Sequence, residues 1–156
     1  MDNLARLVIV DEIKTLKAKY FRGVDTKDMA LLRSIFADDM VCDVRGSATD
    51  PVTGINAVPS VEKVLNGLEE IMTAFAGGIN SFISVHQGCM PEIEVIDENN
   101  AKAIWPMFDT LRFHEGPLLE LTGYGHYHET YQRIGGKWKV KHLRLTRLRV
   151  DAIPRK

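Results

Sequence analysis

The chain has 156 residues, which at roughly 150 residues per domain corresponds to one domain over residues 1–156. Hydrophobic residues make up 45% and charged residues 26%, with 20 basic against 21 acidic side chains and a net charge of −1. This composition excludes wholesale disorder, and it argues against a dedicated nucleic-acid or membrane binder, since no basic surplus and no apolar run of roughly 20 residues is present.

The N-terminal segment MDNLARLVIVDEIK carries acids around a short apolar stretch and has no small-residue cleavage site. It therefore predicts a helix rather than a secretory signal. Cys42 and Cys89 form neither a CxxC pair nor a disulfide framework. We expect two reduced, buried thiols in a cytoplasmic protein.

Two helices are predicted first. Apolar residues from 9 to 24 recur every three or four positions, which is typical of one helical face, and Gly23 is the expected stop. A second helix follows through Phe36, with Asp25 and Asp28 in a capping arrangement, and the acidic pair at 38–39 ends it.

The next segments predict a short strand, a loop and a third helix. MVCDV is strand-like, and residues 46–57 are rich in Gly, Ser, Thr and Pro, as loops are. The third helix begins near Pro59 and keeps its apolar spacing for five turns, until Gly77 and Gly78.

From residue 92 onward the apolar period is two, which predicts antiparallel strands. Residues 92–95 and 101–107 form the first two strands, with Pro106 implying an edge or a bulge. A long strand runs from 118 to 134, Gly135-Gly136 makes a hairpin, and the last strand runs from 137 to about 150. Helices followed by strands predict an α+β fold.

His86 is the first candidate for chemistry. Apolar residues flank it in SFISVHQGCMPEI, which is typical of a core histidine bonded to a backbone carbonyl. A general base would need an acid to orient the imidazole and stabilise its charged form. Asp25 is the acid to test, although an aspartate before TKDMALL is also typical of a helix N-cap. Both alternatives stay open at this point.

Other charged patterns are weaker. His126 and His128 share a strand face without a third ligand at a helpful spacing, so a solvated or interface face is favoured over a zinc site. Eight Lys and Arg lie between 137 and 156, but seven acids between 92 and 120 can pair with them, so nucleic-acid binding is not predicted. The absence of GxGxxG, P-loop, HExxH and GxSxG motifs argues against nucleotide cofactors and serine-hydrolase chemistry.

Three segments together carry a family resemblance over about residues 5–150. AKYFRGVDTKD holds Tyr20 and Asp25 in a Tyr-x-x-x-x-Asp pattern, SVHQGCMPEIEV holds His86, and ETYQRIGGKWKVKHLRLTR forms a closing hairpin with Tyr131 and Trp138. In this order they resemble the SnoaL-like branch of the nuclear transport factor two-like superfamily. The resemblance is closest to bile-acid 7α-dehydratase-like proteins, then to dehydrochlorinases and scytalone dehydratase.

The resemblance implies a cone-shaped, curved antiparallel sheet wrapped around three N-terminal helices and an apolar pocket, often in a homodimer or homotrimer. It implies that His86 removes a proton from substrate carbon, that Asp25 orients the histidine, and that Tyr20 faces the pocket. Arg147 matches a pocket arginine, with Arg144 as the alternative. No metal or organic cofactor is required.

Strand parity adds Trp105, Phe108 and Tyr127 as apolar walls for the substrate. Trp105 and Phe108 have opposite parity, so at most one of the two is expected to line the pocket unless Pro106 introduces a bulge. The loop GSATDPVTGINAV is longer than in the dehydratases that the chain resembles, so their substrates are not carried over.

Three functions remain as hypotheses. The first is a cofactor-independent lyase or isomerase, dehydratase-like, acting on a hydrophobic ring-containing small molecule. The second is a ligand-binding or assembly module without catalysis, since fold alone does not give function. The third is the small subunit of a ring-hydroxylating oxygenase. A contact between Asp25 and His86 would favour the first.

Overall fold

The computed structural model describes residues 1–156. Its elements follow the predicted order of two helices, a short strand, a third helix and then long strands, with one further short strand, β2, before the third helix. They are α1 (Asn3–Asp25), α2 (Met29–Ile35), β1 (Phe36–Asp43), the 3₁₀ turn η1 (Pro59–Val61), β2 (Val64–Asn66), α3 (Leu68–Gly78), the 3₁₀ turn η2 (Ile79–Ser81), β3 (Phe82–Gly88), β4 (Glu92–Val95), β5 (Asn100–Phe113), β6 (Leu118–Ile134) and β7 (Lys137–Pro154).

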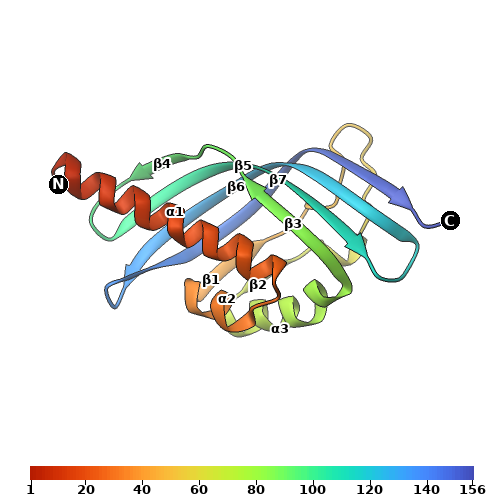
Figure 1. Cartoon of the computed structure of the whole chain (residues 1–156), viewed down its shortest axis with the longest axis horizontal. Coiled ribbons are helices and arrows are strands. Elements are labelled where there is room, and N and C mark those ends of the chain that lie inside the picture. The colour runs from red at the N-terminus through yellow and green to blue at the C-terminus, as the bar shows by residue number, and fades with distance from the viewer.

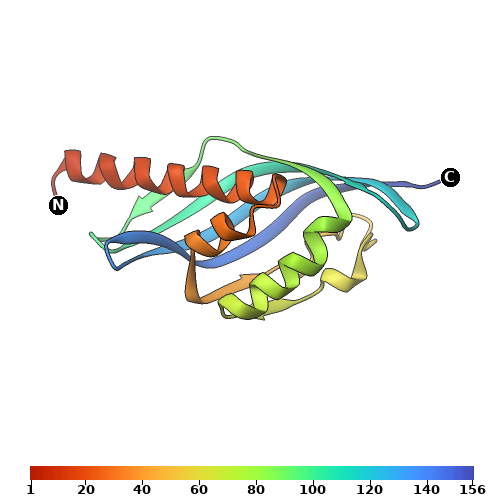
Figure 2. The ribbon, with the colours of Figure 1, turned by 60° about the horizontal axis from the view of Figure 1, so that its bottom comes forward.

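Seven strands form one curved sheet in the order β2-β1-β7-β6-β5-β3, and β4 pairs with β5 on the same side as β3. Helix α1 runs along the sheet, while α2 and α3 lie together near β1 and β2 (Figures 1 and 2). This is the predicted α+β architecture. One detail differs from a wholly antiparallel sheet, because β1 and β7 are parallel. The long connection between them allows that pairing.

A hydrophobic core joins α1 to the inner face of the sheet. The predicted apolar stripe of α1 is buried from Ile9 to Val24, as the helical spacing requires. On β5, alternate residues from Ala101 to Met107 are buried, which confirms the period of two. None of the helices combines the length and hydrophobicity needed to cross a bilayer.

The junction between α1 and α2 differs from the prediction at two residues. Gly23 lies inside α1, and a side chain there would collide with Leu32 of α2, so this glycine permits close helix packing rather than ending the helix. Asp28, not Asp25, caps α2, because its carboxylate accepts a hydrogen bond from the Leu31 amide at 2.9 Å. Asp25 is thereby free to make other contacts.

The acidic pair 38–39 does not end α2 either. The helix ends at Ile35, and β1 begins at Phe36 and includes both acids as exposed residues. Phe36 is buried, so the apolar spacing that continues the helical stripe serves a strand instead.

The predicted third helix is divided into three elements. Residues 59–61 form η1, residues 64–66 form β2, and only 68–78 form α3, which does end at Gly78. Gly67 has φ +85, a conformation that a helix excludes and that glycine adopts readily. The apolar period alone therefore overstated the helix, because β2 contributes to the same spacing.

The later strands follow the prediction, with β6 at Leu118–Ile134 and positive φ at both hairpin glycines. Pro106 lies opposite a bulge, as predicted. Met107 pairs with Gly88 of β3 and Ile104 pairs with Glu92 of β4, so three residues of the β3–β4 connection face only two residues of β5. The Pro106 carbonyl accepts from the Cys89 amide at 2.7 Å within this bulge. Cys42 is buried as predicted, but Cys89 is exposed in that connection, which corrects the expectation of two buried thiols.

Candidate active site

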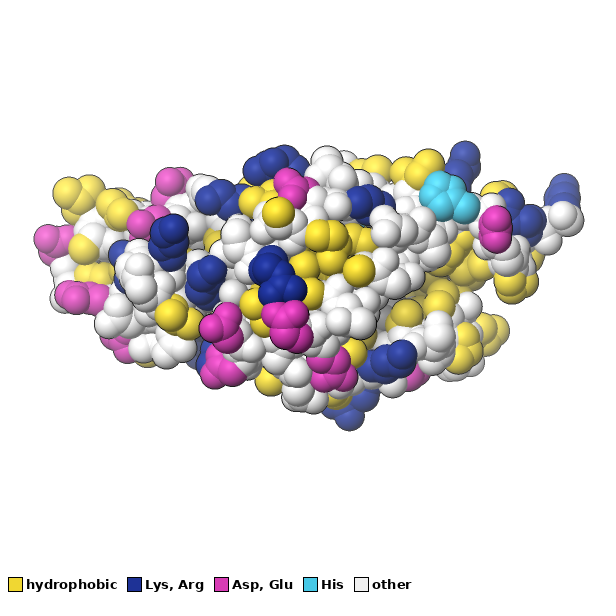
Figure 3. Space-filling model, turned by 90° about the horizontal axis from the view of Figure 1, so that it is seen from below, with side chains coloured by type: hydrophobic (Ala, Val, Ile, Leu, Met, Phe, Trp, Pro, Cys, Tyr) yellow, Lys and Arg dark blue, Asp and Glu magenta, His cyan; other side chains and the backbone are white.

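A cavity of about 600 Å³ lies between the sheet, α3 and the η1 region. Hydrophobic residues account for 18 of its 28 lining residues. Seen from below, the surface is hollowed near the C-terminal end of the sheet, with hydrophobic side chains inside the hollow (Figure 3). The volume lies within the range of about 300–1,000 Å³ that is common for small-molecule sites.

His86 and Asp25 are in direct contact at the cavity wall. His86 Nδ1 lies 2.6 Å from Asp25 Oδ1, and the His86 backbone amide donates to Asp25 Oδ2 at 2.9 Å. The two side chains come from β3 and from the last residue of α1, 61 positions apart. Both are sheltered, with 8% of the His86 side chain and 23% of the Asp25 side chain exposed.

The surroundings of Asp25 keep it ionised. Partial burial alone would raise the pKa of Asp25, but hydrogen bonds from the His86 ring, the His86 amide and the Ser84 hydroxyl outweigh it and lower the pKa. Ser84 Oγ donates to Asp25 at 2.9 Å and accepts from Lys27 at 3.1 Å. In the neutral form of His86, an ionised Asp25 favours the tautomer with the proton on Nδ1, in which the other ring nitrogen, Nε2, is an acceptor.

Tyr20 and Tyr127 line the same cavity, with their rings 5.7 Å apart in an edge-on arrangement. Burial, followed by the neighbouring Tyr127, raises the pKa of Tyr20 well above its usual value. Burial and the nearby Asp109 carboxylate raise the pKa of Tyr127 as well. Both hydroxyls therefore stay protonated and can serve as hydrogen-bond donors.

Arg147 also lines the cavity, whereas Arg144 pairs with Asp43 of β1 outside it. The Arg147 guanidinium donates to both oxygens of Asp109, at 3.0 and 2.9 Å, and its Nε donates to the Ser47 carbonyl at 2.6 Å. The side chains of Arg147 and Asp109 are 4% and 3% exposed. This is a buried, bidentate ion pair at the edge of the cavity.

Asp109 connects this ion pair to the dyad. It is the cross-strand partner of His86 in the β3–β5 pairing, and its Oδ2 lies 3.8 Å from His86 Nε2. The imidazole therefore lies between two carboxylates, with Asp25 at Nδ1 and Asp109 near Nε2.

A second buried ion pair lies next to the cavity wall. Lys17 donates to Glu129 at 2.5 Å, and its ammonium lies 3.5 Å from the centre of the Tyr127 ring and 4.2 Å from that of Tyr20. Burial lowers the pKa of Lys17 to about 8, despite the opposing effect of Glu129. The Lys17 ammonium makes cation–π contacts with both tyrosine rings.

Two predicted wall residues do not line the cavity. Phe108 lies on the other face of β5 and stacks on Tyr124, with ring centres 6.2 Å apart. Trp105 has the inward parity but belongs to the core, where its indole N–H donates to the Tyr131 hydroxyl at 2.8 Å. Only Tyr127 of the three predicted residues lines the cavity. Strand parity predicts which face of the sheet a side chain is on, but it does not predict how far along the strand the cavity lies.

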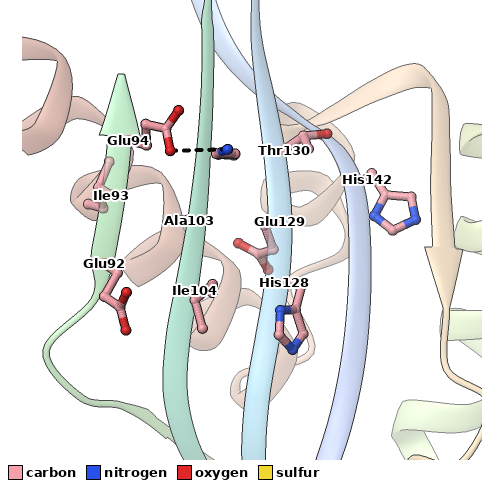
Figure 4. Close-up of a pocket in the computed structure, with 10 residues that line it drawn as sticks. Glu92, Ile93, Glu94, Ala103, Ile104, His128, Glu129, Thr130 and His142 are labelled. Carbon is pink, nitrogen blue, oxygen red and sulfur yellow. Dashed lines mark ion pairs between the residues drawn. The ribbon is translucent and has the colours of Figure 1, made fainter. Parts of the chain in front are cut away.

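A hollow of about 510 Å³ lies on the outer face of the sheet (Figure 4). It includes His128, His142 and the exposed pair formed by Glu94 and Lys102 at 3.0 Å. His128 Nε2 contacts the Thr146 hydroxyl at 3.0 Å, and the ring of His126 lies 6.2 Å away. No group of three or more His, Cys, Asp or Glu side chains has an arrangement that would hold a metal ion.

The sequence did not single out Ser84, Lys27 or Asp109. Asp109 occupies an inward position on β5, where the neighbouring inward residues are apolar, and an acid in such a place is a usable signal. Ser84 shares the strand face of His86, which is the corresponding signal for a residue that supports it.

Comparisons with known proteins agree with this fold. A family model described as a SnoaL-like domain matches residues 5–144. A curated relative, "Probable cyclase FGR4" of Gibberella zeae, is 25% identical over 141 residues, which cover 87% of this chain and 89% of the relative.

Solved structures share the architecture at low identity. A protein assigned as a scytalone dehydratase from Novosphingobium aromaticivorans has a TM-score of 0.79 at 18% identity, covering 97% of this chain and 92% of that one. The hexachlorocyclohexane dehydrochlorinase LinA-type3 from Novosphingobium barchaimii has a TM-score of 0.75 at 19% identity, covering 97% and 94%. At such identities the likeness concerns the fold.

Proposed function

The chain belongs to the SnoaL-like domain family, and we propose that it is a lyase or isomerase that removes a carbon-bound proton from a hydrophobic, ring-containing small molecule. The observation that carries the proposal is the 2.6 Å contact between Asp25 and His86 at the wall of an apolar cavity. Relatives assigned as a dehydratase, a dehydrochlorinase and a cyclase support a lyase-type activity in general terms.

His86 is the general base in this proposal. Its Nε2 takes the proton from carbon, and the C–H electron pair moves into the substrate. The imidazolium that forms is stabilised by the Asp25 carboxylate at Nδ1, which also keeps the ring in the required tautomer. The water-poor wall strengthens this electrostatic stabilisation.

Tyr20 and Tyr127 are the proposed donors to the substrate. Because both hydroxyls remain protonated, they can stabilise negative charge that develops on a carbonyl oxygen, or on a departing group. Arg147 lies at the same end of the cavity, where its guanidinium is paired with Asp109. In an elimination the leaving group departs with its bonding electrons, and in an isomerisation His86 returns the proton to a second carbon. Neither course requires a cofactor.

The binding-only hypothesis predicts that His86 is separated from Asp25 and bonded to a backbone carbonyl. The contact at Nδ1 favours the catalytic hypothesis instead. The homodimer or homotrimer implied by the family resemblance stays a prediction.

Proton exchange in D₂O tests the proposal for an elimination and for an isomerisation alike, because both begin with loss of a carbon-bound proton. Cyclic β-hydroxy ketones, β,γ-unsaturated cyclic ketones and chlorinated cyclohexanes would be incubated with the protein and followed by NMR. We expect loss of a C–H signal or formation of an alkene with the wild type, and neither with His86→Ala. Equal conversion by His86→Ala, or no exchange with any member of the panel, would overturn the proposal.

Asp25→Asn tests the other member of the dyad. It keeps the shape of the side chain but removes the charge that stabilises the imidazolium, so turnover is expected to fall about a hundredfold or more. An unchanged rate would assign Asp25 a structural role only.

A further inference from the structure

The positive charge of Arg147 is already neutralised by a carboxylate of the protein itself. Both terminal nitrogens donate to Asp109, Nη1 also lies 3.4 Å from the Met107 sulfur, and Nε donates to the Ser47 carbonyl. The fork with which a guanidinium binds a carboxylate is therefore occupied by the protein's own acid. A ligand carboxylate would have to displace Asp109 to use it.

The chain makes room for this ion pair. Gly123 on β6 lies directly against it, and a Cβ at that position would overlap the Arg147 guanidinium and the Asp109 carboxylate. The β6–β7 pairing shifts register between Tyr124 and Gly125, beside the strand position of Arg147. The pair is thus a built feature of the cavity wall rather than a contact between mobile surface side chains.

The buried charges that line the cavity include no free cation. Arg147 is offset by Asp109, and both side chains are almost fully buried. Asp25 lies behind His86 and Lys27 approaches it through Ser84, but neither residue lines the cavity. Lys63 lines the cavity as an exposed residue. A buried ligand anion would meet the Asp109 carboxylate without a free buried cation, which is costly.

We propose that the cavity selects uncharged ring-containing ligands and that Asp109 is the residue that excludes anionic ones. This rests on the proposed function only in assuming that the reacting molecule occupies this cavity. It names the substrate class as neutral, with hydroxyl or carbonyl groups for Tyr20 and Tyr127 rather than a carboxylate for Arg147.

Binding of matched probes tests the proposal. Two pairs share a ring system and differ in charge at neutral pH: 2-naphthol with 2-naphthoate, and 9-phenanthrol with phenanthrene-9-carboxylate. Calorimetric titration of the full chain is expected to show about tenfold or tighter binding of the neutral member in at least one pair. Equal or tighter binding of the carboxylates, or no binding of any of the four, would overturn the proposal.

Asp109→Asn identifies the residue responsible. The amide oxygen can still accept from Arg147 while the negative charge is removed, so the preference for the neutral probe is expected to shrink about tenfold or to reverse. Asp43→Asn is the matched control, because Asp43 also pairs with arginines, Arg45 and Arg144, but outside the cavity. An unchanged preference in Asp109→Asn, or the same change in Asp43→Asn, would contradict the assignment.

The titration of the wild type tests the selectivity even if Asp109→Asn does not fold. The selectivity and the proposed function can also be contradicted independently, because ligand binding is measured without turnover. A protein that binds neutral probes but exchanges no protons would retain the selectivity and lose the catalytic proposal.

Discussion

The cavity and the hollow on the outer face of the sheet contain similar residue types but differ in how these are partnered. Each has at least one histidine, at least one carboxylate and a lysine or arginine, and their volumes are about 600 and 510 Å³. His86 contacts a carboxylate and is 8% exposed, whereas His128 contacts a threonine hydroxyl. Hydrophobic residues dominate the cavity lining but supply only 3 of 10 residues in the hollow.

The difference shows that a histidine becomes a candidate general base when a carboxylate contacts one ring nitrogen and the side chain is buried. An imidazole with an ionised acid at one nitrogen has a defined tautomer and a stabilised charged form. His128 has neither, since burial and the neighbouring His126 lower its pKa. Variants at matched positions in and outside the cavity can test this contrast.

Replacing each histidine tests the contrast most directly. His86→Ala is expected to lower kcat/KM by about 10²–10⁴-fold, the contribution of a positioned acid–base group, and His128→Ala to leave it unchanged. Steady-state kinetics on any substrate found in the exchange screen measure both. Equal losses in the two variants would place catalysis elsewhere.

Two Lys–Glu pairs, one buried and one exposed, extend the comparison of sheltered and exposed groups to stability. Lys17→Met leaves Glu129 as an unpaired buried charge and is expected to lower the free energy of unfolding by about 3–5 kcal/mol. Lys102→Met removes an exposed partner of Glu94 and is expected to have little effect. Urea denaturation at neutral pH measures both. A small effect of Lys17→Met would mean that Glu129 finds another partner or takes up a proton.

The double variant Lys17→Met with Glu129→Gln separates charge from packing. If the loss in Lys17→Met comes from the unpaired carboxylate, removing that charge should restore much of the stability. Continued instability would assign the loss to the packing of Lys17 against Tyr20 and Tyr127.

A weaker effect is expected at acid pH. The pKa of Asp25 in the folded state is below its ordinary 3.8, so the folded chain binds fewer protons than the unfolded chain in this range. The stability contributed by Asp25 is therefore fully present above about pH 3.8 and is lost as pH falls through the folded-state value. Denaturation at pH 6 and pH 3 should show a smaller difference for Asp25→Asn than for the wild type, and an equal difference would contradict this contribution.

The fold was predictable because its longest elements carry unambiguous periods. The stripe on α1 and the alternation on β5 and β6 each extend far enough to define a face. The predicted start of the third helix was wrong because Gly67 adopts a positive φ, which the apolar spacing does not reveal. Apolar spacing predicts an element reliably when a single helix or strand carries it, and it fails when the same spacing continues across two different elements.

The site was predictable only in part. Asp25 resembled a cap because its neighbours are typical of a helix start, and the geometry that frees it depends on Asp28 taking that role. Asp109 required the β3–β5 register, which pairs it with His86 from 23 positions away. Arg147 and Arg144 could not be separated without the pairing of β7 with β1 and β6.

The parallel pairing of β1 with β7 has a consequence for how the chain acquires its structure. Strand β7 lies between β1 and β6, so the sheet remains in two separate pieces until the last strand is in place. Contacts between positions about a hundred residues apart are slow to form, because the intervening chain must first be ordered. During synthesis, β1 and β2 therefore remain separate from the other strands until the C-terminal segment has left the ribosome. An intermediate with unpaired strands of this kind is prone to aggregation, and we expect chaperones to bind it.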